Sequence, residues 1–149
     1  MSSDRGPMVR RDQIPVLVVH LIALPAFTLM FLSRQNYEFV LYIGVIVLFL
    51  ALIVTTNRRV AYPTQLLWGL TAWALLHMAG GGVLVGGQIL YKLMLIPISE
   101  KYSIFRYDQF VHIVGFGVAT AVMYHLLLPS LAAPPRRWVS LSIVVAMAG

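Results

Sequence analysis

An acid and a histidine stand four residues apart at the head of a long apolar stretch, in the block Tyr107-Asp108-Gln109-Phe110-Val111-His112. Positions i and i+4 share one face of a helix, so Asp108 and His112 should point the same way. A further histidine, His77, lies near the middle of another apolar stretch. Titratable side chains are costly to place in apolar surroundings, which makes these three residues the candidate catalytic set.

Two histidines and a carboxylate support more than one kind of chemistry. They are the ligand set of several zinc and non-haem iron sites, which keep positions open for water or substrate. The same groups can relay a proton, or act as a general base oriented by its acid. The structural alternative is that Asp108 only caps a helix, because backbone N–H groups and the helix dipole favour an acid there.

The composition indicates that these residues lie in a membrane. Of the 149 residues, 60% are hydrophobic and 11% are charged, whereas about a quarter of a soluble domain is charged. The net charge of +6 does not indicate a nucleic-acid partner, because Lys and Arg fall in the short gaps between apolar stretches. The expected partners are membrane lipids. The chain has no Cys, which excludes disulfides and thiolate sites.

Four apolar stretches are close to the length of about 20 residues that a helix needs to cross a bilayer. They cover residues 14–32, 39–55, 66–85 and 110–128, and a partial fifth stretch covers 138–149. The fifth is too short to cross, so either the chain is a piece of a longer protein or this part packs partway into the bundle. No linker divides the chain. The sequence predicts a single all-α, multi-pass transmembrane domain over residues 1–149.

The positive residues predict how the bundle is oriented. The side that includes the N-terminus holds seven Lys or Arg, and the opposite side holds four (Arg5, Arg10, Arg11, Arg58, Arg59, Arg136 and Arg137 against Arg34, Lys92, Lys101 and Arg106). We expect a protein of the cell inner membrane with a cytosolic N-terminus. In that orientation His77, Asp108 and His112 converge in the outer leaflet.

Glycine and aromatic residues are concentrated after the third stretch. Gly82 and Gly86 have the small-xxx-small spacing that permits close helix contact, within the chain or in a homo-oligomer. The alternative is an unwound segment beside a ligand. Residues 88–106 mix aromatic and basic side chains, as expected at the headgroup level. We predict a re-entrant or interfacial segment that ends at Pro97.

The motif order resembles a known family. Leu76-His77-Met78-Ala79-Gly80-Gly81, an aromatic connection containing Pro, and then Tyr107-Asp108-Gln109-Phe110-Val111-His112 are similar to the bacterial YjdF-like inner-membrane family of unknown function. The likeness covers approximately Trp68 to Leu128, and the further acidic, Trp-containing block of that family does not occur before Gly149. A looser likeness, limited to the Asp-x-x-x-His block and the following span, is to VanZ-like membrane proteins, which are associated with glycopeptide resistance. Neither resemblance implies an established reaction.

Three functional hypotheses remain open at this point. The first is a membrane enzyme for a lipid or lipid-linked substrate, with His77, Asp108 and His112 as an acid–base set or as ligands of zinc or iron. The second is a proton-coupled transporter or permeation subunit, in which the same residues relay protons. The third is a scaffold in which the polar residues only specify helix packing.

Overall fold

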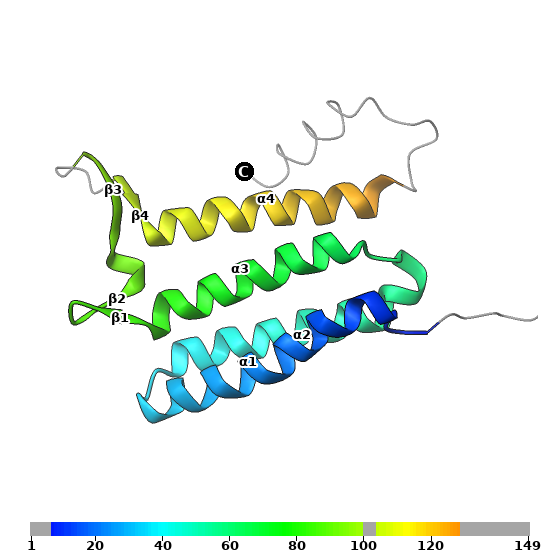
Figure 1. Ribbon diagram of the computed structural model, residues 1–149, viewed down its shortest axis with the longest axis horizontal. Coiled ribbons are helices and arrows are strands. Elements are labelled where there is room, and N and C mark those ends of the chain that lie inside the picture. The colour runs from blue at the N-terminus through cyan, green and yellow to red at the C-terminus, as the bar shows by residue number, and fades with distance from the viewer. Residues whose placement is uncertain (1–6, 100–103, 129–149) are drawn as a thin grey trace, which may run out of the picture.

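Four helices lie side by side along the longest axis of the molecule (Figure 1). The computed structural model describes residues 7–99 and 104–128. A 3₁₀ turn, η1 (Arg11–Gln13), precedes the helices. The helices are α1 (Ile14–Ser33), α2 (Tyr37–Val60), α3 (Thr64–Gly82) and α4 (Tyr107–Leu127). The predicted partial span at 138–149 lies outside the described residues.

Three of these helices are long and apolar enough to cross a membrane. An 18-residue window within each helical segment has a mean hydropathy of 2.3 for Arg11–Ser33, 2.8 for Tyr37–Val60 and 1.7 for Tyr107–Leu127. The fourth helix, α3, is less apolar, since it carries His77 and three glycines at its end. It lies between α4 and the α1–α2 pair (Figure 1). The structure therefore supports three candidate spans plus α3, where the sequence predicted four spans and part of a fifth.

The connection between α3 and α4 departs from the all-α prediction. It contains two small antiparallel sheets and a 3₁₀ turn: β1 (Leu84–Val85) pairs with β2 (Gln88–Ile89), η2 covers Leu90–Lys92, and β3 (Met94–Ser99) pairs with β4 (Ile104–Arg106). The β1–β2 turn needs Gly86 and Gly87, because both have positive φ, 57° and 80°. The predicted helix contact through Gly82 and Gly86 is therefore wrong, since α3 ends before Gly86 and the turn leaves the helix.

The glycines at the end of α3 are covered by side chains of the same chain. A Cβ on Gly80 would overlap the ring of Tyr91, and a Cβ on Gly81 would overlap the ring of Phe39. Gly80 and Gly81 therefore permit close packing within the chain, although through aromatic rings and not through the predicted Gly82–Gly86 spacing. A homo-oligomer remains a prediction that would use other glycines, such as Gly44 and Gly117, which have open space beside them.

Two hydrophobic clusters hold the helices together at opposite ends. One cluster lies near the β-strands, and its buried residues are Leu24, Phe31, Phe39, Ile43 and Met78. The other lies near the N-terminus, and its buried residues are Val16, Tyr62 and Leu67. We call these the hairpin end and the N-terminal end of the bundle. At the hairpin end the Arg34 guanidinium also donates to the carbonyl of Gly82, which fastens the α1–α2 turn to the end of α3.

Candidate functional site

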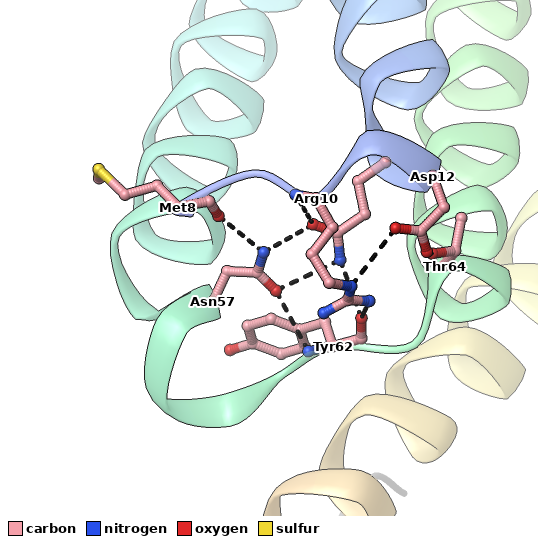
Figure 2. A network of polar contacts seen from close by, with 7 residues as sticks. Met8, Arg10, Asp12, Asn57, Tyr62 and Thr64 are labelled. Carbon is pink, nitrogen blue, oxygen red and sulfur yellow. Dashed lines mark hydrogen bonds and ion pairs between the residues drawn. The ribbon is translucent and has the colours of Figure 1, made fainter. Parts of the chain in front are cut away.

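A buried polar network occupies the N-terminal end (Figure 2). The side-chain amides of Gln13 and Asn57 bond reciprocally, at 2.7 and 3.4 Å, and both residues are buried. Asn57 also donates to the carbonyl of Met8 and accepts from the N–H of Tyr62. Arg10 donates to the carbonyl of Tyr62 at 2.7 Å. The amide groups of this network are thus used in joining η1, the end of α2 and the α2–α3 turn.

His77 is the centre of a different polar group, at the hairpin end. Its Nδ1 atom is hydrogen-bonded to the phenol of Tyr91, which η2 places against α3. Tyr91 approaches so closely because residue 80 is glycine. The backbone of Leu90 bonds the carbonyl of Val83, so the hairpin that follows α3 turns η2 back onto the helix.

Aromatic rings from three other positions enclose this pair. The ring centroid of His77 lies 5.1 Å from that of Tyr42 in an edge-on arrangement and 5.8 Å from that of Phe39. The ring centroid of Tyr107 lies 6.1 Å from that of Tyr91, and the hydroxyl of Tyr107 donates to the carbonyl of Leu76. The rings therefore fix His77 between α2, η2 and the start of α4.

The phenol of Tyr91 stays protonated because it is buried. Burial raises the pKa of Tyr91, and the nearby Tyr107, Tyr42 and Asp108 act in the same direction. Tyr91 therefore keeps its hydrogen, which it can donate to Nδ1. In that tautomer a neutral His77 carries its own hydrogen on Nε2, and in the other tautomer Nδ1 donates to the phenol oxygen and Nε2 is an acceptor.

His77 also belongs to the wall of a large cavity. The cavity has a volume of about 780 Å³ and is lined by residues of all four helices. It runs from Gln13 and Asn57, at the N-terminal end, to Tyr42 and His77, at the hairpin end. The walls between these polar ends are almost wholly apolar, and a second histidine, the buried His20, is also part of them.

The side chains of Asp108 and His112 each have a hydrogen-bond partner other than one another. The carboxylate of Asp108 lies 2.9 Å from the guanidinium of Arg106, and its other oxygen accepts from the N–H of Gln109. His112 is exposed, and its Nδ1 atom lies 2.6 Å from the backbone carbonyl of Asp108. Asp108 lies in the first turn of α4, as the capping interpretation expected.

The three predicted residues do not form a common metal-ligand set. Across residues 7–99 and 104–128, no three His, Cys, Asp or Glu side chains are grouped so that they could hold a metal ion. Each of the three also has a hydrogen-bond partner of its own: Tyr91 for His77, Arg106 for Asp108, and a backbone carbonyl for His112. Zinc or iron at these residues stays a prediction.

Sequence reasoning found His77 but missed its partner. Tyr91 sits among several tyrosines of residues 88–106, and nothing in that mixture distinguishes it. The usable signal was Gly80, one helical turn after His77, which leaves room for a ring beside the imidazole. His20 lies within the apolar stretch 14–32, and no pattern in the sequence indicates that it shares a cavity with His77.

Comparisons with known proteins agree with the membrane character of the chain. The profile of one family, described as a predicted membrane protein (DUF2238), matches residues 14–149. This is consistent with the resemblance to YjdF-like proteins. No curated protein and no solved structure matches the chain.

Proposed function

Since the chain belongs to the DUF2238 family of predicted membrane proteins, we propose that it is an integral membrane enzyme that acts on a lipid or lipid-linked substrate. The observation that carries the proposal is that His77, hydrogen-bonded to Tyr91, lies in the wall of the apolar cavity. In this proposal the apolar chain of the substrate occupies the cavity, and its polar part reaches His77.

The size and lining of the cavity fit such a chain. Small-molecule sites measure roughly 300 to 1,000 Å³ and combine apolar walls with a few polar groups, and the cavity of about 780 Å³ lies in this range. From Tyr42 to Asn57 it extends along α2 for about 22 Å at 1.5 Å per residue. A long hydrocarbon chain lying parallel to the helices is the ligand that suits these dimensions.

His77 supplies the acid–base chemistry in this proposal. A neutral imidazole that accepts the phenol hydrogen on Nδ1 presents a fixed Nε2–H, which donates a hydrogen bond to a substrate oxygen. In the other tautomer Nδ1 donates to the phenol oxygen, and the free Nε2 lone pair is the group that a general base requires. Tyr91 is a positioning residue, because it sets the ring orientation. Asp108 and His112 remain proposed members of the site, with Asp108 near enough to Tyr91 to influence its phenol.

The proposed location is the cell inner membrane, with the N-terminus in the cytosol. The N-terminal end of the bundle carries Arg10, Arg11, Arg58 and Arg59, which supports this orientation by the positive-inside rule. The hairpin end and His77 then belong to the outer half of the bilayer. The finer likeness to YjdF-like proteins is compatible with this placement.

The test of the enzyme is a search for lipid turnover. Protein reconstituted with a total bacterial lipid extract is incubated, and lipid masses are compared before and after. We expect one lipid class to be converted, with a rate about a hundredfold or more lower in His77→Gln, since this is the usual contribution of an acid–base residue. Unchanged lipids with the wild-type protein would refute the enzyme. A proton flux that depends on His77, without turnover, would favour the transporter.

The cavity is tested separately by filling it. Ala119 lines the cavity, whereas Ala121 is exposed on the same helix, so Ala119→Trp and Ala121→Trp form a matched pair. We expect native mass spectrometry to show a retained lipid in the wild type and in Ala121→Trp, and to show its loss in Ala119→Trp. Equal retention in all three proteins would mean that the lipid lies elsewhere.

A further inference from the structure

The strands between α3 and α4 expose apolar side chains at the end of the bundle. We call the described residues of this connection, 83–99 and 104–106, the hairpin layer. Six of its apolar residues are between 38% and 55% exposed (Val83, Leu84, Val85, Leu93, Leu95 and Ile96). A cluster of this kind on an otherwise water-facing loop normally marks a surface that binds something.

The direction of the strands indicates what this surface meets. β3 runs across the ends of the helices rather than along them (Figure 1). If α1, α2 and α4 cross the membrane, β3 therefore lies in the membrane plane, at the depth where the helices end. Leu32 and Tyr37, beside the α1–α2 turn at the same end, are also exposed, so the apolar surface is continuous with that of the spanning helices.

The charge of the connection complements a lipid surface. Residues 83–106 of the sequence contain Lys92, Lys101 and Arg106 against one acid, Glu100, and since Arg106 is paired with Asp108 at the start of α4, the excess positive charge comes from the lysines. The side chain of Lys92 is exposed. Basic residues interleaved with large apolar ones are the pattern that binds at the headgroup level, where water remains available to the backbone groups of short strands.

From these observations we propose that the hairpin layer is immersed in the headgroup region of the adjoining leaflet, with Leu84 and Ile96 in contact with lipid. The partner is a lipid surface, and anionic lipids suit it best. The inference does not depend on the enzymatic proposal, because it uses only the exposed face of the layer. It places the His77–Tyr91 pair directly beneath a membrane-embedded cover.

The absence of Cys from the chain allows a direct test. Nitroxide labels are attached to Leu84→Cys and Ile96→Cys in vesicles of phosphatidylcholine and phosphatidylglycerol. Collision with oxygen, which concentrates in lipid, is compared with collision with a water-soluble nickel chelate. Leu48→Cys, exposed in the middle of α2, is the lipid reference, and Arg59→Cys, exposed at the end of α2, is the water reference.

We expect both hairpin labels to lie between the two references, with oxygen accessibility above that of Arg59→Cys and nickel accessibility several-fold below it. Nickel accessibility equal to that of Arg59→Cys would place the layer in water and overturn the proposal. Protection from both reagents would show that protein covers the surface, which would overturn it as well.

Discussion

The two ends of the bundle use buried polar groups in opposite ways. At the N-terminal end, the amides of Gln13 and Asn57 are engaged with each other and with backbone groups. At the hairpin end, His77 uses Nδ1 for Tyr91, and its second ring nitrogen is left without a hydrogen bond from any described residue. The first arrangement joins parts of the backbone, and the second leaves a ring nitrogen of His77 for a ligand.

The same contrast appears in the types of residue. The Gln13–Asn57 network relies on amides and on Arg10, none of which changes its protonation near neutral pH, although His125 lies beside Tyr62 at the same end and bonds the carbonyl of Val60. The hairpin end brings a histidine together with tyrosines, which can exchange protons. Because the cavity extends from one end to the other, the comparison predicts that damage at the first end costs stability and damage at the second costs function.

The largest expected effect on stability is at the buried network of Gln13 and Asn57. Asn57→Leu removes both hydrogen bonds between Asn57 and Gln13, and it also leaves the carbonyl of Met8 and the N–H of Tyr62 without their side-chain partner, so it should lower the free energy of unfolding by about 3 kcal/mol. Thermal unfolding in detergent measures this. Arg58→Ala, an exposed neighbour, is the control and should stay within about 0.5 kcal/mol. A small effect of Asn57→Leu would contradict the structural role of the network.

An intermediate effect is expected where Tyr91 meets α3. Gly80→Ala places a Cβ in the space of the Tyr91 ring, which should cost about 1 to 3 kcal/mol and disturb the pair with His77. Gly44→Ala is the matched control, because its Cβ meets nothing and alanine favours helix by up to about 1 kcal/mol. If both substitutions stabilise the protein, the close approach of Tyr91 is wrong.

A smaller effect should appear only in alkali. The pKa of Tyr91 is raised in the folded protein, so its protonated form stabilises the fold at pH values below the ordinary tyrosine pKa of about 10. This contribution is lost as the pH rises above that value, because the unfolded chain then releases the proton first. The wild type should therefore lose more thermal stability than Tyr91→Phe between pH 8 and pH 10.5 (about half a unit past that pKa). Parallel curves for the two proteins would show that the phenol is not buried.

The smallest effect on stability is expected at His112. The side chain is exposed and bonds only the carbonyl of Asp108 within its own helix, so His112→Ala should change the free energy of unfolding by no more than about 0.5 kcal/mol. Its effect on lipid turnover decides whether this residue belongs to the site beside His77. If His112→Ala loses lipid turnover without losing stability, His112 belongs to the site.

Much of the bundle could be predicted from hydrophobicity alone. The stretch at 14–32 matches α1 within one residue, since an apolar run bounded by polar residues determines a membrane helix directly. The second helix is longer than the apolar run, because Asn36 caps its start and Asn57 is buried near its end. Polar residues that are satisfied by tertiary contacts cannot be told from loop residues in sequence.

The site was harder to predict because its geometry depends on the connection. Asp108 and His112 share a helix face, but the carboxylate turns to Arg106, which precedes the helix. Tyr91 reaches His77 only after the chain has reversed at Gly86 and Gly87. Periodicity locates residues along one helix, and it carries no information about the side chain that a loop brings to them.

The bond from Arg34 to the carbonyl of Gly82 has a consequence for biogenesis. The two residues are 48 positions apart, so Arg34 is synthesised well before the carbonyl to which it donates. Until the end of α3 is in place, the charge of Arg34 needs other polar partners, such as water. The α1–α2 turn is therefore fastened only after α3 has been made, so this part of the bundle is completed in the order of the sequence.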